Sequence, residues 1–248
     1  MKLDRYNRLK ALEEYGFNIN WDILKSKTVI IFGCGGLGGV VAELLARMGI
    51  GKLILFDLDK VSIENLNRFV FNENDIGLPK VDVLKKYINL INKDVEVDTY
   101  YTDIMGMEIE DKFDDIIKEG DLGMMCLDNV PARQFMNSKS IQNNIPFVEA
   151  GLLRSGLGGY VHLVIPFETP CYQCIGSIKV KDTNDTKGEP CSASLPTTVN
   201  IVASLQVQHA IKYLLKFGSI PDYVGYDALY DENIIVPLKR DVNCYICG

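Results

Sequence analysis

The feature that most restricts the fold of this chain is the glycine-rich run Gly33–Gly38, which reads GCGGLG. It follows a short apolar run, Thr28–Phe32, and precedes apolar residues that recur at helical spacing over Val40–Met48. Glycine lets the backbone approach a phosphate closely, and the N-terminus of the next helix supplies amide donors and a favourable dipole. Asp57 ends the following apolar run and is placed to bind a ribose hydroxyl. This pattern predicts a nucleotide site on a strand–turn–helix unit.

Apolar runs alternate with helical patterns over residues 1–150, as in an α/β fold with a Rossmann-like, doubly wound, mainly parallel sheet. The expected strands are Thr28–Phe32, Lys52–Phe56, Val95–Tyr101, Leu122–Cys126 and Pro146–Glu149. The expected helices are Asp4–Tyr15, Val40–Met48, Pro79–Ile91 and Pro131–Asn143.

The pattern changes after residue 150 and predicts an antiparallel extension of the sheet. The expected elements are the strands Gly159–Ile165, Tyr223–Asp227 and Ile234–Leu238, with a long helix over Pro196–Phe217. The polar segment Lys179–Pro190 has no periodicity and is predicted to be a loop. Because no long linker or repeat interrupts the chain, we expect a single domain over residues 1–248.

Charge and hydropathy exclude several classes of protein. The formal net charge is −7 and no run of lysines and arginines occurs, which argues against binding to nucleic acid phosphates. Five glycines and Glu43 interrupt the most apolar stretch, Val29–Ala46, so it does not resemble a membrane span. The charged N-terminus lacks an apolar signal core, and we therefore expect a cytoplasmic protein.

The residues that follow the second strand distinguish ATP from NAD as the nucleotide. Asn65, Arg68 and Lys80 cluster in a region where a dehydrogenase has no need of them. Attack at the α-phosphate of ATP spreads negative charge over the phosphate oxygens, and fixed cations stabilise that charge. Asp128, at the end of the Leu122–Cys126 strand, is a candidate ligand for the magnesium that accompanies ATP.

Four cysteines form two CxxC pairs, Cys171/Cys174 and Cys244/Cys247, separated by 69 residues. Four thiolates suit a closed, tetrahedral zinc site that leaves no position open for catalysis. A redox role for one pair is the alternative. The pattern favours a structural zinc site that ties the second pair to the body of the domain.

Six motifs in order resemble the ThiF-type adenylyltransferases, which include the bacterial activators of sulfur carriers and the adenylation domains of ubiquitin-activating enzymes. They are RYNR (5–8), GCGGLG (33–38), DLDKVSIENLNR (57–68), GLPK (77–80), CLDN (126–129) and the paired CxxC motifs. The resemblance implies that Arg8 reaches the ATP site of the partner subunit in a homodimer. It implies that Asn65, Arg68 and Lys80 contact the triphosphate, with Asp59 nearby. The residues assigned to the nucleotide are Gly33, Gly35, Gly36, Gly38, Asp57, Asp59, Asn65, Arg68 and Lys80, with Mg²⁺ on Asp128.

Cys191 is the candidate nucleophile among the remaining cysteines. It precedes a helix N-terminus, which lowers the pKa of a thiol and favours the thiolate. Cys34 and Cys126, in contrast, are expected to be small buried side chains that pack in the core. The run CSASLPTT (191–198) resembles the branch of this family that activates the ubiquitin-fold modifier, which implies a thioester on Cys191. An unreactive loop cysteine is the alternative. His162 and His209 are expected to be packing residues.

The expected function is ATP-dependent adenylation of the C-terminal glycine of a ubiquitin-like protein, followed by thioester transfer to Cys191. Residues 1–150 would bind the nucleotide, and residues 151–248 would bind the carrier and hold the zinc site. The expected partners are a ubiquitin-like or sulfur-carrier protein ending in Gly-Gly and a second copy of the chain. A conjugating enzyme or sulfur donor would dock on the body of the dimer. The alternatives are a sulfur-carrier adenylyltransferase without an obligatory thioester, an NAD-binding oxidoreductase and a nonenzymatic scaffold.

Overall fold

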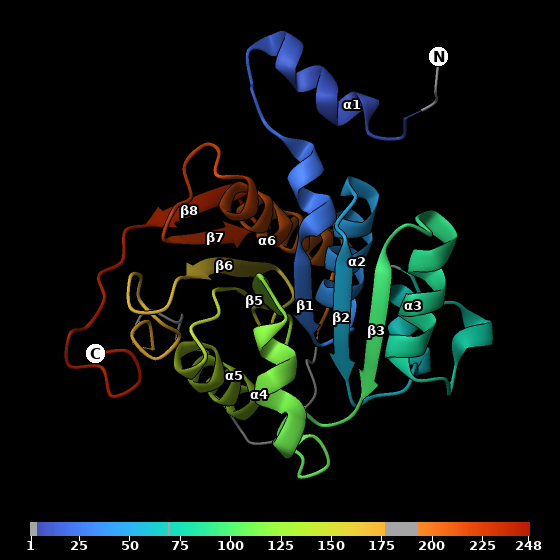
Figure 1. Cartoon of the computed structure of the whole chain (residues 1–248). Coiled ribbons are helices and arrows are strands. Elements are labelled where there is room, and N and C mark those ends of the chain that lie inside the picture. The colour runs from blue at the N-terminus through green and yellow to red at the C-terminus, as the bar shows by residue number, and fades with distance from the viewer. Residues whose placement is uncertain (1–3, 69, 177–192) are drawn as a thin grey trace.

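The computed structural model describes residues 4–68, 70–176 and 193–248, and its main element is an eight-stranded sheet with helices on both faces (Figure 1). The strands are β1 (Thr28–Phe32), β2 (Lys52–Asp57), β3 (Glu96–Tyr101), β4 (Leu122–Met125), β5 (Phe147–Leu152), β6 (Gly158–Val164), β7 (Tyr223–Asp227) and β8 (Glu232–Val236). The α-helices are α1 (Asn7–Lys10), α2 (Gly36–Met48), α3 (Lys80–Ile91), α4 (Glu110–Lys118), α5 (Val130–Gln142) and α6 (Pro196–Leu215). Short 3₁₀ helices are η1 (Ala11–Tyr15), η2 (Trp21–Ser26), η3 (Ile63–Asn67) and η4 (Glu73–Asp75).

The strands are arranged in the order β3-β2-β1-β4-β5-β6-β7-β8. The first five in the chain pair in parallel, whereas β6, β7 and β8 pair antiparallel to their neighbours. This confirms the predicted parallel sheet with an antiparallel extension. Because the chain turns to opposite sides after β1 and β4, the carboxyl ends of these two strands form the switch point where α/β sheets bind ligands.

Alternating side chains on the central strands divide the core into two layers. In β1, Ile31 faces α2, α3 and α6, whereas Ile30 and Phe32 face α4 and α5. All three side chains are buried, as the continuous apolar run predicted. A parallel sheet of this kind needs helices on both faces, and the chain supplies them between its strands.

Several elements differ from the sequence-based expectations. The helix expected over Asp4–Tyr15 is the short α1 followed by the 3₁₀ helix η1. Helix α4 was not predicted because Glu110–Lys118 is highly charged, yet Phe113, Ile116 and Ile117 recur at helical spacing and pack on the sheet. Strand β8 begins at Glu232, two residues before the predicted start, because pairing with β7 sets its register from Glu232 opposite Asp227.

The N-terminal segment lies at the edge of the sheet where β1, β2 and β3 begin (Figure 1). The Tyr6 hydroxyl accepts a hydrogen bond of 3.0 Å from the Asn92 side chain, just after α3. Its ring lies against Gly49, where a Cβ atom would approach the ring carbon Cζ to 2.6 Å. Arg5 donates to the carbonyl of Ile91 at 2.9 Å. These contacts fix α1 at the amino edge, opposite the glycine-rich run.

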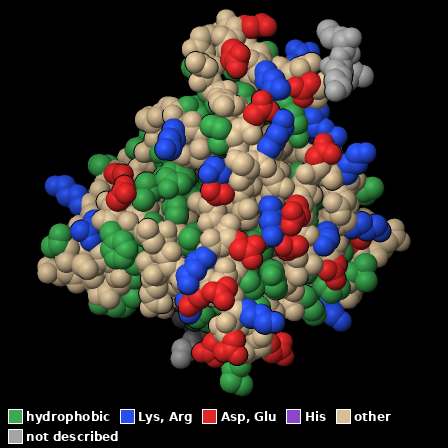
Figure 2. Space-filling model, viewed as in Figure 1, with side chains coloured by type: hydrophobic (Ala, Val, Ile, Leu, Met, Phe, Trp, Pro, Cys, Tyr) green, Lys and Arg blue, Asp and Glu red, His purple; other side chains and the backbone are tan. Residues whose placement is uncertain are grey.

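The distribution of surface charge and the apolar character of the helices can be compared with the expectations from the sequence. On the face shown in Figure 2, acidic and basic side chains are interspersed. Within the described parts of the chain, no helix combines the length and the apolar character needed to cross a membrane.

Candidate active site and metal centre

The glycine-rich turn between β1 and α2 is closely packed at two of its glycines and open at a third. Gly33 has a φ of +92°, and a Cβ there would lie 2.6 Å from the carbonyl oxygen of Cys126. A Cβ on Gly38 would collide with the carbonyl of Gly33. A Cβ on Gly35, in contrast, would meet no heavy atom of the described residues within 4 Å. Gly33 and Gly38 therefore shape the turn, and Gly35 exposes backbone to a ligand.

The first turn of α2 offers unused backbone donors at this position. The N–H of Gly39 is the first to close a helical turn, on the carbonyl of Gly35 at 2.9 Å. The preceding N–H groups have no intrahelical acceptor, and Gly35 provides no side-chain cap. Free amides and the positive end of the helix dipole are the features that bind a phosphate.

Asp57 at the end of β2 holds the turn from the neighbouring strand. Its carboxylate accepts the N–H of Cys34 at 2.6 Å and the N–H of Asp59 at 2.7 Å. Burial raises the pKa of Asp57, while the nearby charge of Lys80 opposes that rise. Each carboxylate oxygen keeps a second lone pair that could accept a ribose hydroxyl. The structure therefore assigns Asp57 a bond to the turn that the sequence did not reveal.

A crossing segment, residues 58–68 and 70–79, connects β2 to α3 beside the turn. Its two ends pair antiparallel through a bridge between Lys60 and Pro79, and the N–H of Val61 donates to Leu78 at 2.9 Å. The pairing brings Asp59 to Lys80, whose Nζ lies 2.7 Å from the Asp59 carboxylate. Lys80 is only 8% exposed. Burial of its side chain and the ion pair with the exposed Asp59 therefore fix the position of its ammonium group.

Arg68 extends from the crossing segment toward the turn, and Asn65 lies three residues before it in η3. A Cβ on Gly36 would lie 3.0 Å from Cδ and 3.3 Å from Nε of Arg68, so this side chain lies across the first residue of α2. Arg68 makes no ion pair with any described residue. The Asn65 oxygen is used by Ser62, whose N–H and hydroxyl lie 3.0 and 3.2 Å away, which leaves the Asn65 amide nitrogen for a ligand.

Asp128 follows β4 at the same edge of the sheet. Its side chain is exposed and accepts a hydrogen bond of 3.3 Å from the Asn129 side chain. The Cys126 carbonyl, two residues earlier, lies against Gly33. Asp128 is therefore an accessible carboxylate beside the turn, which fits a magnesium ligand because this ion favours carboxylate oxygens and water.

Two cavities differ in size and in their distance from this edge. The smaller, of about 180 Å³, is lined by Leu66, Asn67, Arg68, Pro196, Val199 and Asn200. The larger, of about 540 Å³, lies near the end of α6 and includes Lys27 and Asp121, which pair with each other at 2.7 Å. The smaller cavity adjoins the glycine-rich turn, since Val199 and Arg68 both contact Gly36. The smaller cavity therefore lies beside the predicted nucleotide site.

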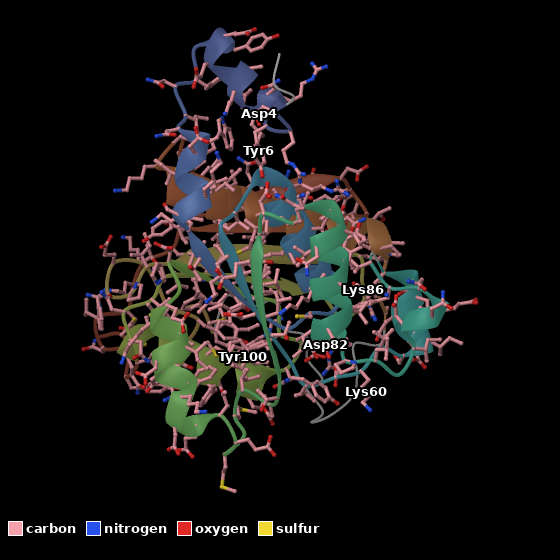
Figure 3. All side chains as sticks on the ribbon, turned by 45° about the vertical axis from the view of Figure 1, so that its right-hand side comes forward. Asp4, Tyr6, Lys60, Asp82, Lys86 and Tyr100 are labelled. Atoms are coloured by element: carbon pink, nitrogen blue, oxygen red, sulfur yellow. The ribbon has the colours of Figure 1, made fainter. Side chains whose placement is uncertain are left out.

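The structure does not bring Arg8 to the other predicted site residues. Arg8 is exposed on α1, which the Tyr6 and Arg5 contacts hold at the amino edge. In Figure 3, Tyr6 lies at the opposite end of the molecule from Lys60, which belongs to the crossing segment. Helix α2 spans 13 residues between the two edges, or about 20 Å. A role for Arg8 at a nucleotide therefore requires the nucleotide site of another chain.

The four predicted zinc ligands converge in what we call the four-cysteine cluster. The sulfur atoms of Cys171, Cys174, Cys244 and Cys247 lie within 4.8 Å of one another. The separations are 3.8 Å for Cys171–Cys174, 3.7 Å for Cys171–Cys244 and 3.5 Å for Cys174–Cys247. Tetrahedral zinc with bonds of about 2.3 Å needs sulfur separations of about 3.8 Å, so the cluster fits zinc. These separations are much longer than the disulfide bond of about 2.05 Å.

Two polar residues near this cluster were not predicted from the sequence. Asn137 of α5 donates to the Cys171 sulfur at 3.7 Å and accepts the N–H of Tyr172 at 2.9 Å. Arg240 donates to the carbonyl of Cys247. A single Asn or Arg outside any motif gives no sequence signal, so neither residue could be assigned to the cluster from the sequence alone.

The remaining cysteines and histidines are placed in or near the core. Cys34 is buried, and Cys126 donates to the Gln206 side chain at 3.5 Å. Burial raises the pKa of Cys126 to about 12, which leaves it a thiol at neutral pH. His162 and His209 are buried as expected. Cys191 and the predicted loop Lys179–Pro190 lie outside the described residues.

The same fold occurs in solved structures of the enzyme MccB. A crystal structure of E. coli MccB with ATP matches all of this chain and 75% of its own, with a TM-score of 0.84 and 26% identity. The microcin C7 biosynthetic enzyme MccB in complex with N-formylated MccA matches 99% of this chain and 75% of its own, with a TM-score of 0.84 and 25% identity.

Curated relatives share the name ubiquitin-like modifier-activating enzyme 5. The proteins of Drosophila mojavensis and Aedes aegypti are each 39% identical over 251 residues, which cover 96% of this chain. The chain spans 63% of the length of these two relatives. The model of the ThiF family matches residues 6–246. With the glycine-rich turn, the crossing segment and most of the four-cysteine cluster inside that match, the chain belongs to the ThiF family.

Proposed function

We propose that this chain adenylates the C-terminal glycine of a ubiquitin-like protein with ATP and then takes the acyl group on Cys191. The observation that carries the proposal is the contact of Arg68 with Gly36, which sets a cation that has no ion pair among the described residues against the turn that would hold the phosphates. The names of the curated relatives support the same activity.

The first step would take place at the α-phosphorus. A carboxylate oxygen of the carrier's terminal glycine attacks it, the bond to the bridging oxygen of the β-phosphate breaks, and pyrophosphate leaves. The amides at the start of α2 would hold phosphate oxygens, and Arg68 and Lys80 would stabilise the charge that develops. Asp57 would hold the ribose, with Asn65 on the phosphates or the sugar and Asp59 orienting Lys80.

Two further groups would stabilise the negative charge on the phosphates in this proposal: a magnesium ion and an arginine from a second chain. Asp128 would hold Mg²⁺, which neutralises charge on the phosphates. Arg8 would enter the site of a second copy of the chain, because its own α1 lies at the opposite edge. We propose a homodimer on this ground and, from the sequence, a cytoplasmic location.

The second step would transfer the acyl group from adenylate to sulfur. The Cys191 thiolate attacks the acyl carbon, the bond to the phosphate oxygen of AMP breaks, and AMP leaves; the thiol proton goes to solvent. Ala193 lies against Gly156, and Val199 lies against Gly36, so residues that follow Cys191 reach the nucleotide edge. Residues 151–248 would therefore bind the carrier, and zinc in the four-cysteine cluster would be structural.

An ATP–pyrophosphate exchange assay tests the first step. We expect exchange that depends on a ubiquitin-like protein ending in Gly-Gly, and no exchange with any such protein would refute adenylation. If the chain instead binds NADH in a fluorescence titration, that result would support the alternative of an NAD-binding oxidoreductase.

A separate assay tests the thioester. We expect a reducible adduct between enzyme and carrier that disappears in Cys191→Ala while exchange persists. Exchange without an adduct in the wild type would indicate the alternative, a sulfur-carrier adenylyltransferase that does not use an obligatory thioester. An adduct that survives in Cys191→Ala would show that another residue is the nucleophile.

A further inference from the structure

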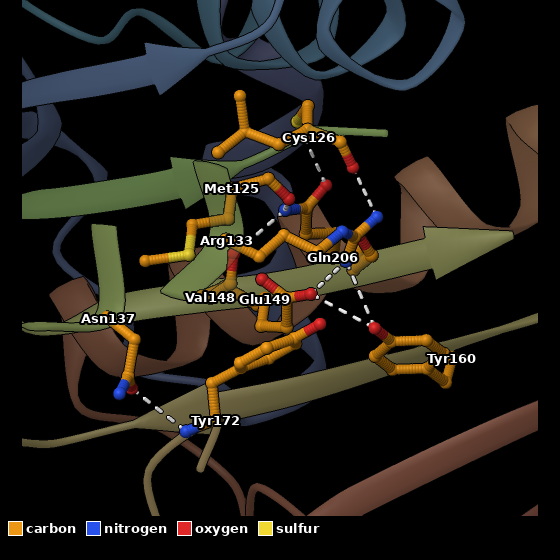
Figure 4. Close-up of polar contacts among 11 residues, drawn as sticks. Met125, Cys126, Arg133, Asn137, Val148, Glu149, Tyr160, Tyr172 and Gln206 are labelled. Atoms are coloured by element: carbon orange, nitrogen blue, oxygen red, sulfur yellow. Dashed lines mark hydrogen bonds and ion pairs between the residues drawn. The ribbon is translucent and has the colours of Figure 1, made fainter. Parts of the chain in front are cut away.

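Arg133, in the first turn of α5, is a buried arginine that the proposed mechanism does not use. It is 8% exposed. Its Nη2 donates to the carbonyl of Leu127, the residue immediately before Asp128. Its Nη1 donates to the Glu149 carboxylate, and lies 3.1 Å from the Ala150 carbonyl and 3.0 Å from the Tyr160 hydroxyl (Figure 4). The guanidinium therefore joins the connection after β4 to strands β5 and β6.

Glu149 anchors this arginine from the sheet. The Glu149 side chain is fully buried, and its Oε1 also accepts the Tyr160 hydroxyl at 3.0 Å. The Tyr160 ring stacks on Tyr223 of β7, with centroids 5.5 Å apart and planes at 10°. Both ends of the link are thus fixed: the acid and the tyrosine belong to the sheet, and the arginine belongs to the helix.

The end of β4 is held from both faces of the sheet. From α6, Gln206 Nε2 donates to the Met125 carbonyl at 3.1 Å and to the Val148 carbonyl at 2.9 Å. From α5, Arg133 holds the Leu127 carbonyl. On the far side of Asp128, the Asn129 side chain caps α5 by accepting the N–H of Ala132 at 2.9 Å. The backbone is therefore fixed before and after Asp128, while the Asp128 carboxylate itself remains exposed.

Stability alone does not account for a charge pair in this place. A buried pair such as Arg133–Glu149 adds little over a well-packed apolar pair of similar volume. An apolar pair cannot replace the two donors of the guanidinium. Nη1 donates to Glu149 while Nη2 donates to the Leu127 carbonyl, so one side chain joins both groups.

We propose that Arg133 is a positioning residue that aims the Asp128 carboxylate at the metal-bearing side of the nucleotide site. The inference rests on the proposed function of Asp128 as a magnesium ligand. Outer contacts of this kind orient a metal ligand, and their loss commonly weakens metal binding by about 10- to 100-fold.

The test measures binding of Mn²⁺, as a paramagnetic substitute for Mg²⁺, to the full chain with an α,β-methylene analogue of ATP. Electron paramagnetic resonance counts free Mn²⁺ during the titration. In Arg133→Lys, whose single ammonium cannot hold both Glu149 and Leu127, we expect the Mn²⁺ dissociation constant to rise about tenfold. Binding of the analogue without metal should change less than about twofold, because no contact to the turn is lost.

Two variants separate positioning from folding. Arg133→Met with Glu149→Leu replaces the buried charges with apolar side chains; it should keep the fold and should weaken Mn²⁺ binding as Arg133→Lys does. Gln206→Met removes a comparable buried contact to β4 but not the one beside Asp128. It should lower the melting temperature without changing Mn²⁺ affinity. Mn²⁺ affinity at the wild-type level in both arginine variants would overturn the proposal.

The same titration separates this inference from the proposed function. If Asp128→Asn binds Mn²⁺ as tightly as the wild type, Asp128 is not a ligand and the role of Arg133 falls with it. If Mn²⁺ affinity falls in Asp128→Asn and Arg133→Lys but no carrier supports pyrophosphate exchange, the positioning role stands and adenylation fails.

Discussion

The nucleotide edge and the four-cysteine cluster use their polar groups in opposite ways. At the edge, Arg68 has no ion pair among the described residues and the Asp128 carboxylate is exposed. In the cluster, four sulfurs face one another within 4.8 Å, and their neighbours Asn137 and Arg240 complete the surroundings. A site that binds and releases a ligand keeps donors and charges free, whereas a structural metal site uses all of its ligands.

This difference predicts how the two regions respond to substitution. Changes in the cluster should act mainly on stability, and changes at the edge should act mainly on the reaction. The four predictions that follow test this division from the largest expected effect to the smallest.

Loss of one ligand from the cluster should have the largest effect. Cys247→Ser should remove zinc and lower the free energy of unfolding by more than about 4 kcal/mol, because the metal ties Cys171–Gly176 to the C-terminal segment. Elemental analysis and thermal denaturation measure both. Cys126→Ser, outside the cluster, should keep its zinc. A Cys247→Ser protein with full zinc content and normal melting would show that Cys247 is not a zinc ligand.

Removal of the free cation at the edge should affect the reaction without affecting the fold. Arg68→Ala should lower ATP–pyrophosphate exchange by about 10²- to 10³-fold, because one donor to the developing charge is lost. The melting temperature should stay close to that of the wild type, since Arg68 makes no ion pair with the described residues. The matched control is Lys86→Ala, an exposed lysine on α3. Equal losses in both variants would contradict a specific role for Arg68.

Asp59 should have a smaller effect because it acts through Lys80. Asp59→Asn removes the charge that holds the Lys80 ammonium at 2.7 Å and should lower exchange about tenfold, or about 1.4 kcal/mol in the barrier. Combined with Lys80→Ala, it should add almost nothing, because the group it orients is then absent. Fully additive losses would show that Asp59 contacts the substrate independently.

The smallest of the four expected effects is the contribution of Asp57 to stability, which is separate from its proposed role in binding ribose and is visible in the pH dependence of unfolding. Burial raises the pKa of Asp57 in the folded protein above its unfolded value of about 3.9. The folded state therefore binds the proton more tightly, and this contribution to stability, present at lower pH, is lost as pH rises through the folded pKa. Urea unfolding, followed upward from about pH 4, should show that Asp57→Asn lacks this loss. Parallel pH profiles for variant and wild type would rule out the assignment.

The sequence was most informative where the signal was local. The run GCGGLG between a buried strand and a helix predicted the turn, and the spacing of the CxxC pairs predicted four converging sulfurs. The charged segment Glu110–Lys118 gave no such signal, because only three of its residues pack on the sheet.

Contacts between distant segments that share no recognisable motif could not be predicted. Lys80 meets Asp59 only because the crossing segment folds back on itself between Lys60 and Pro79. Arg133 is buried because its partners come from β5 and β6, and nothing near it in the sequence indicates burial. Local spacing identifies a motif, whereas the partners of a buried charge depend on how the sheet is assembled.

The position of α1 has a consequence for enzyme kinetics. With about 20 Å of α2 between Arg8 and its own glycine-rich turn, no rotation of that side chain completes the site within one chain. If Arg8 assists the reaction, specific activity depends on protein concentration and falls on dilution. Mixing inactive Arg8→Ala and Arg68→Ala proteins would then restore activity, because each mixed pair contains one site with both arginines.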